Sequence, residues 1–450
     1  MKIIIVGIGK IGRNLTYFLS QENHDITVID TNPNVIENIV GLYDVKGIVG
    51  NGASNEILQE AEIQKTDLLI ASSSSDELNI LCSLVGKMNG VKYTIARVRN
   101  PEYSSQINFM HHELGLNMIV NPELEAANEI LQMLKFPSAL QVDKFAGGKV
   151  DIVEIKLEEA SPIVGKTLSN IRTNFQIKFL ICAVERDGKA YIPSGDFILQ
   201  PKDKIYVTAS NKEIVKFFKK LGILKDRARK VMIIGGSKIS YYLAKQLEEA
   251  NVDVKIIEMD INRCQELSDT LNNVTIIHGA GSDHNLLEEE GISSCDAFVT
   301  LTGLDEENII TSLYAIKKNI SKVITKINRD NLTDILGTIG IDSIISPKAI
   351  ITNSVLSFIR SIENTFGSKV KRLYKLVNNQ VEATEFYIQQ KTNFTNVLIK
   401  DLKTKPNVLI ACIIRNNNII IPTGNDLLKP QDSVIVVSTD QIRNLSEILE

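Results

Sequence analysis

The chain repeats itself at a nearly constant offset, and this repeat constrains its fold more than any other feature. Residues 2–7 (KIIIVG) recur as residues 230–235 (KVMIIG), and residues 28–30 (VID) recur as residues 256–258 (IIE). Convergent patterns would not keep one register over so long a span, so the match indicates duplication of a whole unit. The later pairs are shifted by one further residue, which indicates a single insertion. They are residues 50–54 with 279–283, Asp67 with Asp296, Asp76, Glu77 and Asn79 with Asp305, Glu306 and Asn308, and Arg186, Pro193, Gly195, Pro201 and Asp203 with Arg415, Pro422, Gly424, Pro430 and Asp432.

Each half predicts two domains of different kinds. Short β-branched runs first alternate with helical patterns, which predicts a Rossmann-like, doubly wound parallel sheet with helices on both faces. Short strands separated by turns follow, which predicts a small α+β domain closed by a helix at residues 211–220. The fold class is therefore α/β, as two copies of this pair. The expected boundaries are 1–121 and 229–346 for the nucleotide-binding domains, 122–147 for a connecting helix and linker, 347–370 for the second connecting helix, and 148–225 and 371–450 for the small domains.

The first half opens with a dinucleotide-binding fingerprint. Residues 7–12 (GIGKIG) match G-x-G-x-x-G, follow a β-run and precede an amphipathic helix. Gly7 permits a tight turn, Gly9 lets the backbone approach a pyrophosphate, and Gly12 allows close helix–strand packing. Asp30, at the end of the second strand, would accept hydrogen bonds from ribose hydroxyls and repel a 2′-phosphate. This favours NAD(H) or an adenine mononucleotide over NADP(H); the alternative is that the glycines serve packing alone.

The second fingerprint has lost two glycines. Residues 235–240 read GGSKIS, so that Ser237 and Ser240 replace the second and third glycines, while Glu258 keeps the ribose acceptor. Ser237 brings a side chain to the place where the backbone would meet a phosphate. Two interpretations stay open: a weaker or different nucleotide site, or an empty structural copy.

Polar residues follow two further strands at the same sheet edge. The run at residues 72–77 (SSSSDE) lies beside the expected crevice, where it could contact a ligand or cap the next helix. Arg97 ends a later strand, and Lys326 is its counterpart. Each could pair with a phosphate or form a surface salt bridge.

Several function classes are disfavoured. A net charge of −4 and a pI near 5.9 argue against nucleic-acid binding. Five scattered cysteines without a CxxC pair predict reduced thiols in a cytoplasmic protein, and the five histidines form no metal-ligand spacing. A dehydrogenase needs an acid or base near the nicotinamide, yet residues 148–221 contain no histidine. We therefore expect no catalytic residues and no metal site.

Together these motifs resemble the RCK (regulator of potassium conductance, or KTN) family. The resemblance covers essentially all of the chain as an N–C–N–C tandem. It depends on the fingerprint with Asp30 and on further segments of the nucleotide fold and the small domain. The supporting segments are residues 50–54 (GNGAS), 75–79 (SDELN), 95–99 (IARVR) and 163–168 (IVGKTL), with Pro193, Gly195, Pro201 and Asp203.

The resemblance implies a regulatory subunit. Such chains assemble into a ring, expected here to be a homotetramer, beneath a membrane potassium translocating subunit, and nucleotide occupancy gates ion flow. The protein would be cytoplasmic and peripheral at the inner face of the membrane, binding NAD or NADH, with ATP or ADP as alternatives. The positions that match ligand contacts are Gly7, Ile8, Gly9, Lys10, Ile11, Gly12, Asp30, Ser73, Ser74 and Arg97 in the first site, and Gly235, Gly236, Ser237, Lys238, Ile239, Glu258, Thr302 and Lys326 in the second.

Overall fold

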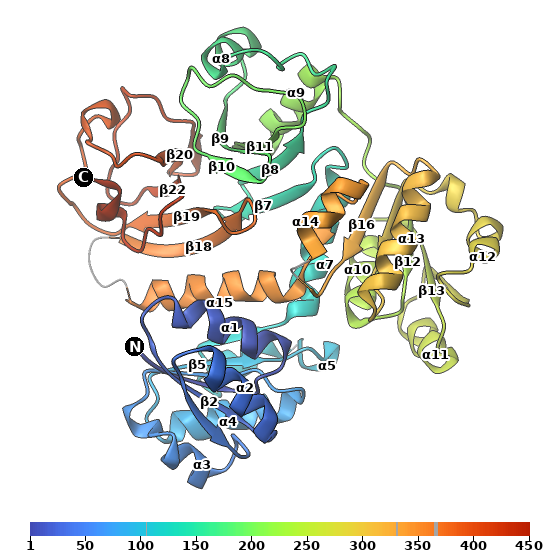
Figure 1. Cartoon of the computed structure of the whole chain (residues 1–450), viewed down its shortest axis with the longest axis vertical. Helices are drawn as coiled ribbons and strands as arrows, with labels where there is room; N and C mark the ends of the chain where they lie inside the picture. Colours follow the sequence, from blue (N-terminus) through green and yellow to red (C-terminus); the bar gives the residue numbers. More distant parts are fainter. Residues whose placement is uncertain (105, 330–331, 364–367) are drawn as a thin grey trace. The chain divides into compact units, whose positions relative to one another are not determined.

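A computed structural model describes residues 1–104, 106–329, 332–363 and 368–450. The chain divides into two compact units. Unit 1 contains the first nucleotide fold together with short segments from the second half. Unit 2 contains the rest of the second nucleotide fold and both small domains (Figure 1). The segments of unit 1 are Met1–Asn128, Gly236–Lys245 and Ser346–Thr352, and those of unit 2 are Glu129–Gly235, Gln246–Ile345 and Asn353–Glu450.

The first nucleotide fold is a parallel six-stranded sheet in the order β3-β2-β1-β4-β5-β6. The strand order reverses between β1 and β4, and in such sheets ligands bind at the carboxyl ends of the strands beside the reversal. The short strand β6 was not predicted from the sequence. The elements are β1 (Lys2–Val6), α1 (Lys10–Ser20), β2 (Asp25–Asp30), α2 (Pro33–Leu42), β3 (Lys46–Val49), α3 (Asn55–Glu60), η1 (Ile63–Lys65), β4 (Leu68–Ala71), α4 (Asp76–Met88), β5 (Tyr93–Arg97), α5 (Pro101–Ser104), α6 (Ile107–His112), β6 (Met118–Val120) and α7 (Pro122–Lys135).

The second nucleotide fold has the same order, β14-β13-β12-β15-β16-β17, again parallel. The duplication inferred from the sequence is therefore present in the strand topology. Its elements are β12 (Lys230–Ile234), α10 (Lys238–Glu249), β13 (Asp253–Glu258), α11 (Ile261–Thr270), β14 (Val274–His278), α12 (His284–Glu289), η2 (Ile292–Ser294), β15 (Ala297–Thr300), α13 (Asp305–Lys317), β16 (Lys322–Lys326), α14 (Thr333–Leu336), η4 (Gly337–Ile339), β17 (Ile344–Ile345) and α15 (Pro347–Glu363).

Each small domain is an antiparallel five-stranded sheet, ordered β10-β9-β11-β8-β7 in the first and β18-β19-β22-β20-β21 in the second. Strand β7 lies in the segment for which the sequence predicted only a helix and a linker. The first domain closes with helix α9. The second closes with the short 3-10 helix η6 (η marks a 3-10 helix throughout), where the Asn444 side chain accepts from the Ser446 N–H. The elements are β7 (Gln141–Phe145), β8 (Val150–Lys156), α8 (Leu168–Phe175), β9 (Phe179–Arg186), β10 (Lys189–Tyr191), β11 (Lys204–Ser210), α9 (Asn211–Leu221), β18 (Ser368–Leu376), β19 (Val381–Ile388), η5 (Ile399–Asp401), β20 (Val408–Arg415), β21 (Asn418–Ile420), β22 (Ser433–Ser438) and η6 (Leu445–Ile448).

The two small sheets share one apolar core. Phe145, Ile152 and Ala183 from the first domain pack in the same cluster as Val381 and Ile435 from the second. The sheets therefore bury each other's apolar faces, and strands of both lie side by side in Figure 1. No helix in the described part of the chain combines the length and apolarity needed to cross a membrane.

A carboxyl group buried in the first small sheet predicts an unusual pH dependence. Asp143 on β7 is 2% exposed, and burial raises its pKa to about 7, with Glu154 and Asp151 adding to the rise. An unfolded Asp has a pKa of about 3.9, so the folded state holds this proton more tightly. The stabilisation from this group is complete below about pH 4 and is lost as the pH rises to about 7.

Asp143→Asn should therefore raise the thermal unfolding temperature at pH 8 and change it little at pH 4. The asparagine mimics the protonated acid and keeps an oxygen for the Gln141 side chain, which donates to Asp143 at 2.8 Å. Calorimetry at the two pH values tests this, with Asp196→Asn, at an exposed carboxylate, as the control. A lower unfolding temperature for Asp143→Asn at pH 8 would contradict the prediction.

Candidate functional site

The fold itself requires two of the three fingerprint glycines. Gly7 has φ +85°, and a Cβ there would lie 2.5 Å from the backbone nitrogen of Ser73. A Cβ on Gly12 would lie 2.1 Å from the Gly7 carbonyl oxygen. Both distances are far below van der Waals contact, so the turn between β1 and α1 closes only with glycine at these positions. The contact also shows that the structure brings Gly7 and Ser73 together.

The fold does not require a glycine at position 9, where Gly9 stands. Its φ is −72°, which any residue adopts, and a Cβ there would have no heavy atom within 4 Å. Gly9 is the N-cap of α1, where no side chain caps the helix and no acidic residue stands in the first turn. The first N–H groups of an uncapped helix attract anions. Open space and backbone hydrogen-bond donors therefore lie at the position where the sequence predicts a pyrophosphate.

Asp30 is held beside this turn by backbone donors. One carboxylate oxygen accepts from the Ile8 N–H at 2.7 Å, and the other accepts from the Asn32 N–H at 2.9 Å. These bonds fix the carboxylate at the carboxyl end of β2. Ile8 and Ile11 are buried in the core, so only their backbone groups can face a ligand, whereas the Lys10 side chain is exposed.

Two residues that the motifs do not mark as ligand contacts, Asp76 and Asn79, hold the loops of the site in place. Asn79 on α4 accepts from the Ser73 N–H at 2.8 Å and donates to the Arg97 carbonyl at 2.9 Å. Asp76 accepts from the Arg99 and Asn100 N–H groups, both at 2.8 Å. The recurrence of Asp76 and Asn79 as a matched pair in the second half was the signal that could have identified them.

The serine run contains a helix cap, one of the two interpretations left open. The hydroxyl of Ser75 accepts from the Leu78 N–H at 3.1 Å and starts α4. The hydroxyl of Ser73 bonds within its own loop, donating to the Ser75 carbonyl at 3.2 Å, and the carbonyl of Ser74 accepts from the Arg99 side chain. The loop is thus held by its own hydrogen bonds.

Arg97 forms an ion pair, but a largely buried one. Its guanidinium lies 3.6 Å from the carboxylate of Glu123 on α7, and the two side chains are 16% and 17% exposed. Burial lowers the pKa of Arg97, which the charge of Glu123 partly offsets. The Nε atom of Arg97 is buried and has no hydrogen-bond partner in the described residues. The ion pair with Glu123 thus matches the salt-bridge interpretation of Arg97, although the pair lies largely inside the fold and not on the surface.

The second copy keeps the loop framework in unit 2. Gly235 has φ +93°, and a Cβ there would lie 3.0 Å from the Thr302 nitrogen. Asn308 accepts from the Thr302 N–H at 3.0 Å and donates to the Lys326 carbonyl at 3.0 Å, as Asn79 does in the first copy. The Lys326 ammonium donates to the Thr302 carbonyl at 2.9 Å, and Glu258 accepts from the Asp260 N–H at 2.7 Å.

The segment that follows Gly235 differs in a way that matters for anions. The hydroxyl of Ser237 accepts from the Ser240 N–H at 3.3 Å, so a side chain caps α10 where Gly9 leaves α1 open. The Ser237 and Ser240 hydroxyls also lie 3.0 Å apart. Gly236 and Ile239 are buried, and Lys238 is half-buried in the first turn of α10. This helix start offers a phosphate fewer free donors than the first.

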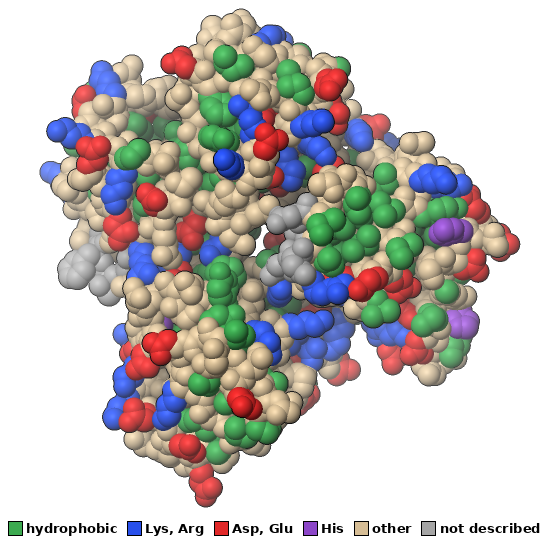
Figure 2. All heavy atoms as spheres, in the orientation of Figure 1, with side chains coloured by type: hydrophobic (Ala, Val, Ile, Leu, Met, Phe, Trp, Pro, Cys, Tyr) green, Lys and Arg blue, Asp and Glu red, His purple; other side chains and the backbone are tan. Residues whose placement is uncertain are grey.

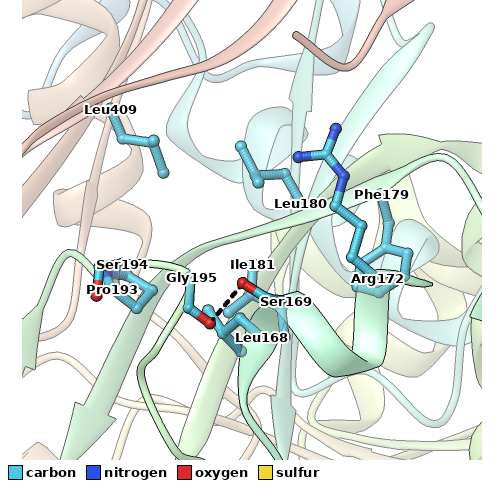
Figure 3. Close-up of a pocket in the computed structure, with 10 residues that line it drawn as sticks. All are labelled: Leu168, Ser169, Arg172, Phe179, Leu180, Ile181, Pro193, Ser194, Gly195 and Leu409. Atoms are coloured by element: carbon cyan, nitrogen blue, oxygen red, sulfur yellow. Dashed lines mark hydrogen bonds between the residues drawn. The ribbon is translucent and has the colours of Figure 1, made fainter. Parts of the chain in front are cut away.

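A separate cavity of about 240 Å³ lies in unit 2 (Figure 3). Arg172 and Leu168 from α8 line it together with Leu409 from β20, and Ser169 donates to the Gly195 carbonyl at 2.9 Å. None of the predicted nucleotide contacts lies there. Within the described residues, no three His, Cys, Asp or Glu side chains are arranged to hold a metal ion.

Comparison with known proteins assigns the family. The TrkA-N domain model matches residues 3–122 and 231–347, and the TrkA-C domain model matches residues 152–222. The chain belongs to the TrkA family. The TrkA-N matches cover more than half of the chain and include both glycine turns described above.

Two relatives that match this TrkA-family chain over nearly its full length are Trk system potassium uptake proteins. The Trk system potassium uptake protein TrkA of Halomonas elongata is 30% identical over 458 residues, covering 100% of this chain and 99% of the relative. The TrkA homolog 1 of Methanosarcina mazei is 31% identical over 446 residues, covering 97% of each. Among solved structures, the GsuK RCK domain matches with a TM-score of 0.64 at 18% identity, covering 97% of this chain and 92% of that one. This confirms the predicted fold of tandem RCK-type units.

Proposed function

We propose that this chain is the nucleotide-sensing regulatory subunit of a Trk-type potassium uptake system, with its principal site in the first nucleotide fold. The observation that carries the proposal is Gly9, a glycine that neither backbone strain nor a neighbouring atom requires, at an uncapped helix start. A ligand that needs close backbone approach explains it. Asp30 beside the turn favours NAD or NADH, with ATP or ADP as alternatives. One structural relative is described as the GsuK channel bound to NAD.

The partner would be a membrane potassium translocating subunit of the TrkH or TrkG kind. The family name supports this, since the full-length relatives are Trk system potassium uptake proteins. The chain would work as a cytoplasmic protein, peripheral at the inner face of the membrane. Nucleotide binding would shift the equilibrium between two ring geometries, which requires only a difference in affinity between them.

Self-association, expected as a homotetrameric ring, has support on the surface. Leu81 on α4 and Ile310 on α13 occupy equivalent positions in the two halves and are 49% and 61% exposed. Leu304 and Met88 are also exposed, at 64% and 87%. The exposed apolar side chain that recurs at the Leu81 and Ile310 positions suits a protein contact, and Leu304 and Met88 add exposed apolar surface without a repeated counterpart. On the face shown in Figure 2, basic and acidic side chains are mixed, which does not suit a nucleic-acid surface.

Two other functions make different predictions. An NAD-dependent oxidoreductase would oxidise NADH steadily when a carbonyl substrate is added, whereas a regulatory subunit would bind NADH without turnover. A nucleotide sensor of a different cation transporter would bind NADH equally well but would co-purify from membranes with another partner. For the second copy we propose a weaker or different nucleotide site, because Ser237 caps the helix start that would meet a phosphate.

Asp30→Asn should weaken NADH binding by about tenfold, since charge-assisted hydrogen bonds to the ribose are lost. The amide oxygen still accepts from the Ile8 N–H, but the amide nitrogen cannot accept from the Asn32 N–H, so the unfolding temperature should fall slightly while the fold is retained. Isothermal titration with NADH, NAD, ATP and ADP measures the affinities. Asp44→Asn, at an exposed carboxylate of the same domain, is the control. Equal NADH affinity in both variants would show that the ribose lies elsewhere.

A further inference from the structure

A polar hollow of about 580 Å³ lies between the two small domains of unit 2, apart from both nucleotide folds. The turn between β7 and β8 forms one side of it, and strands β18, β19 and β20 form the other. These elements lie next to one another in Figure 1. Ligand sites have volumes of a few hundred to about 1,000 Å³. The hollow is thus large enough for a small molecule.

A β-bulge directs two adjacent cations toward the hollow. Along β18, Val370 pairs with Phe386 and Arg372 pairs with Glu385, so Lys371 is an extra residue in the ladder. Lys371 and Arg372 are both exposed, although neighbouring residues of a regular strand face opposite sides. Both line the hollow. Bulges commonly redirect a side chain beside a functional site.

Two of the three cations that line the hollow have neutral partners. Lys149 donates to the Asn417 side chain at 2.6 Å, and Lys371 donates to the Ser433 hydroxyl at 3.0 Å. The one lining carboxylate, Glu385, is 2% exposed and accepts from the Ala146 N–H at 2.9 Å. The positive charges therefore exceed the negative charge around this space, in a chain whose net charge is −4.

The side chains that line the hollow also limit the kind of anion that can bind there. Asn416, Gln431 and Ser433 add polar groups, while few apolar side chains line the hollow. The aromatic side chain among the described lining residues is Tyr387, and the Lys371 ammonium lies 4.4 Å above its ring. This contact disfavours a stacked nucleobase relative to a compact anion. We propose that this hollow binds a small phosphorylated anion carrying at least two negative charges, independently of the nucleotide sites.

The absence of tryptophan from the sequence makes a direct test possible. Tyr387→Trp introduces a single indole at the hollow, and inorganic pyrophosphate titrated into the full-length chain should change its fluorescence saturably. Lys371→Gln in that background should raise the dissociation constant by at least about tenfold, because a charge-assisted hydrogen bond is lost. Arg372→Gln should act in the same direction.

Lys403→Gln, at an exposed lysine of the same small domain, is the matched control and should leave the dissociation constant unchanged. NADH affinity should be equal in all of these variants, which separates this site from the nucleotide sites. Sodium chloride at the same ionic strength should not reproduce the fluorescence change. A flat pyrophosphate titration, or an effect of Lys403→Gln as large as that of Lys371→Gln, would overturn the proposal.

Discussion

Gly9→Ala is expected to weaken NADH binding by at least about tenfold while leaving the unfolding temperature almost unchanged. The added methyl group meets no protein atom within 4 Å, so the folded chain accepts it. A bound pyrophosphate would need that space, and the methyl group would hold it away from the first N–H groups of α1. Titration calorimetry and thermal unfolding measure the two effects separately.

Two further glycines provide the controls. Gly41 lies in helix α2 of the same domain, and a Cβ there would also have no heavy atom within 4 Å, so Gly41→Ala should leave NADH affinity unchanged and stabilise the helix by up to about 1 kcal/mol. Gly12→Ala should instead destabilise the fold by about 1–3 kcal/mol or more, because its Cβ would lie 2.1 Å from the Gly7 carbonyl oxygen. Unaltered NADH affinity in Gly9→Ala would remove the main support for the nucleotide site.

Glu382→Gln is expected to destabilise unit 2 by about 3–5 kcal/mol. Arg360 on α15 has a side chain with 0% exposure, and its two terminal nitrogens donate to the Glu382 carboxylate at 2.7 and 3.2 Å. Removing the negative charge leaves the buried guanidinium of Arg360 without the carboxylate that offsets the cost of burying its positive charge. Denaturant unfolding followed by far-UV circular dichroism would measure the loss.

An exposed ion pair offers the comparison. Glu266 pairs with Arg263 at 2.7 Å, but its side chain is 65% exposed, so Glu266→Gln should cost at most about 1 kcal/mol. Replacing both Arg360 and Glu382 with methionine should recover much of the loss, because a buried pair exchanged for apolar groups is often neutral. If Glu382→Gln and Glu266→Gln cost the same, the buried pair does not secure α15 to the second small domain.

The first nucleotide fold was predictable because its signals are local. Apolar runs with β-branched residues mark strands β1 to β5, and the fingerprint with Asp30 marks the turn and the strand end beside it. By contrast, β6 has three residues, and β7 (QVDKF) carries Asp143 toward the interior. Burial of that carboxyl depends on the strands around it. The five residues of β7 alone therefore do not show that Asp143 is buried.

The duplication and the two kinds of domain followed from the sequence alone, and so did the prediction that Asp30 accepts from a ribose, because each depends on residue spacing along the chain. Tertiary structure decided which glycines the fold itself requires, since only packing shows that Gly7 and Gly12 are crowded and Gly9 is not. It also decided that Arg97 pairs with Glu123 and that Lys149 and Lys371 line the same hollow. Residues so far apart meet only after folding, because no local propensity encodes contacts between distant segments.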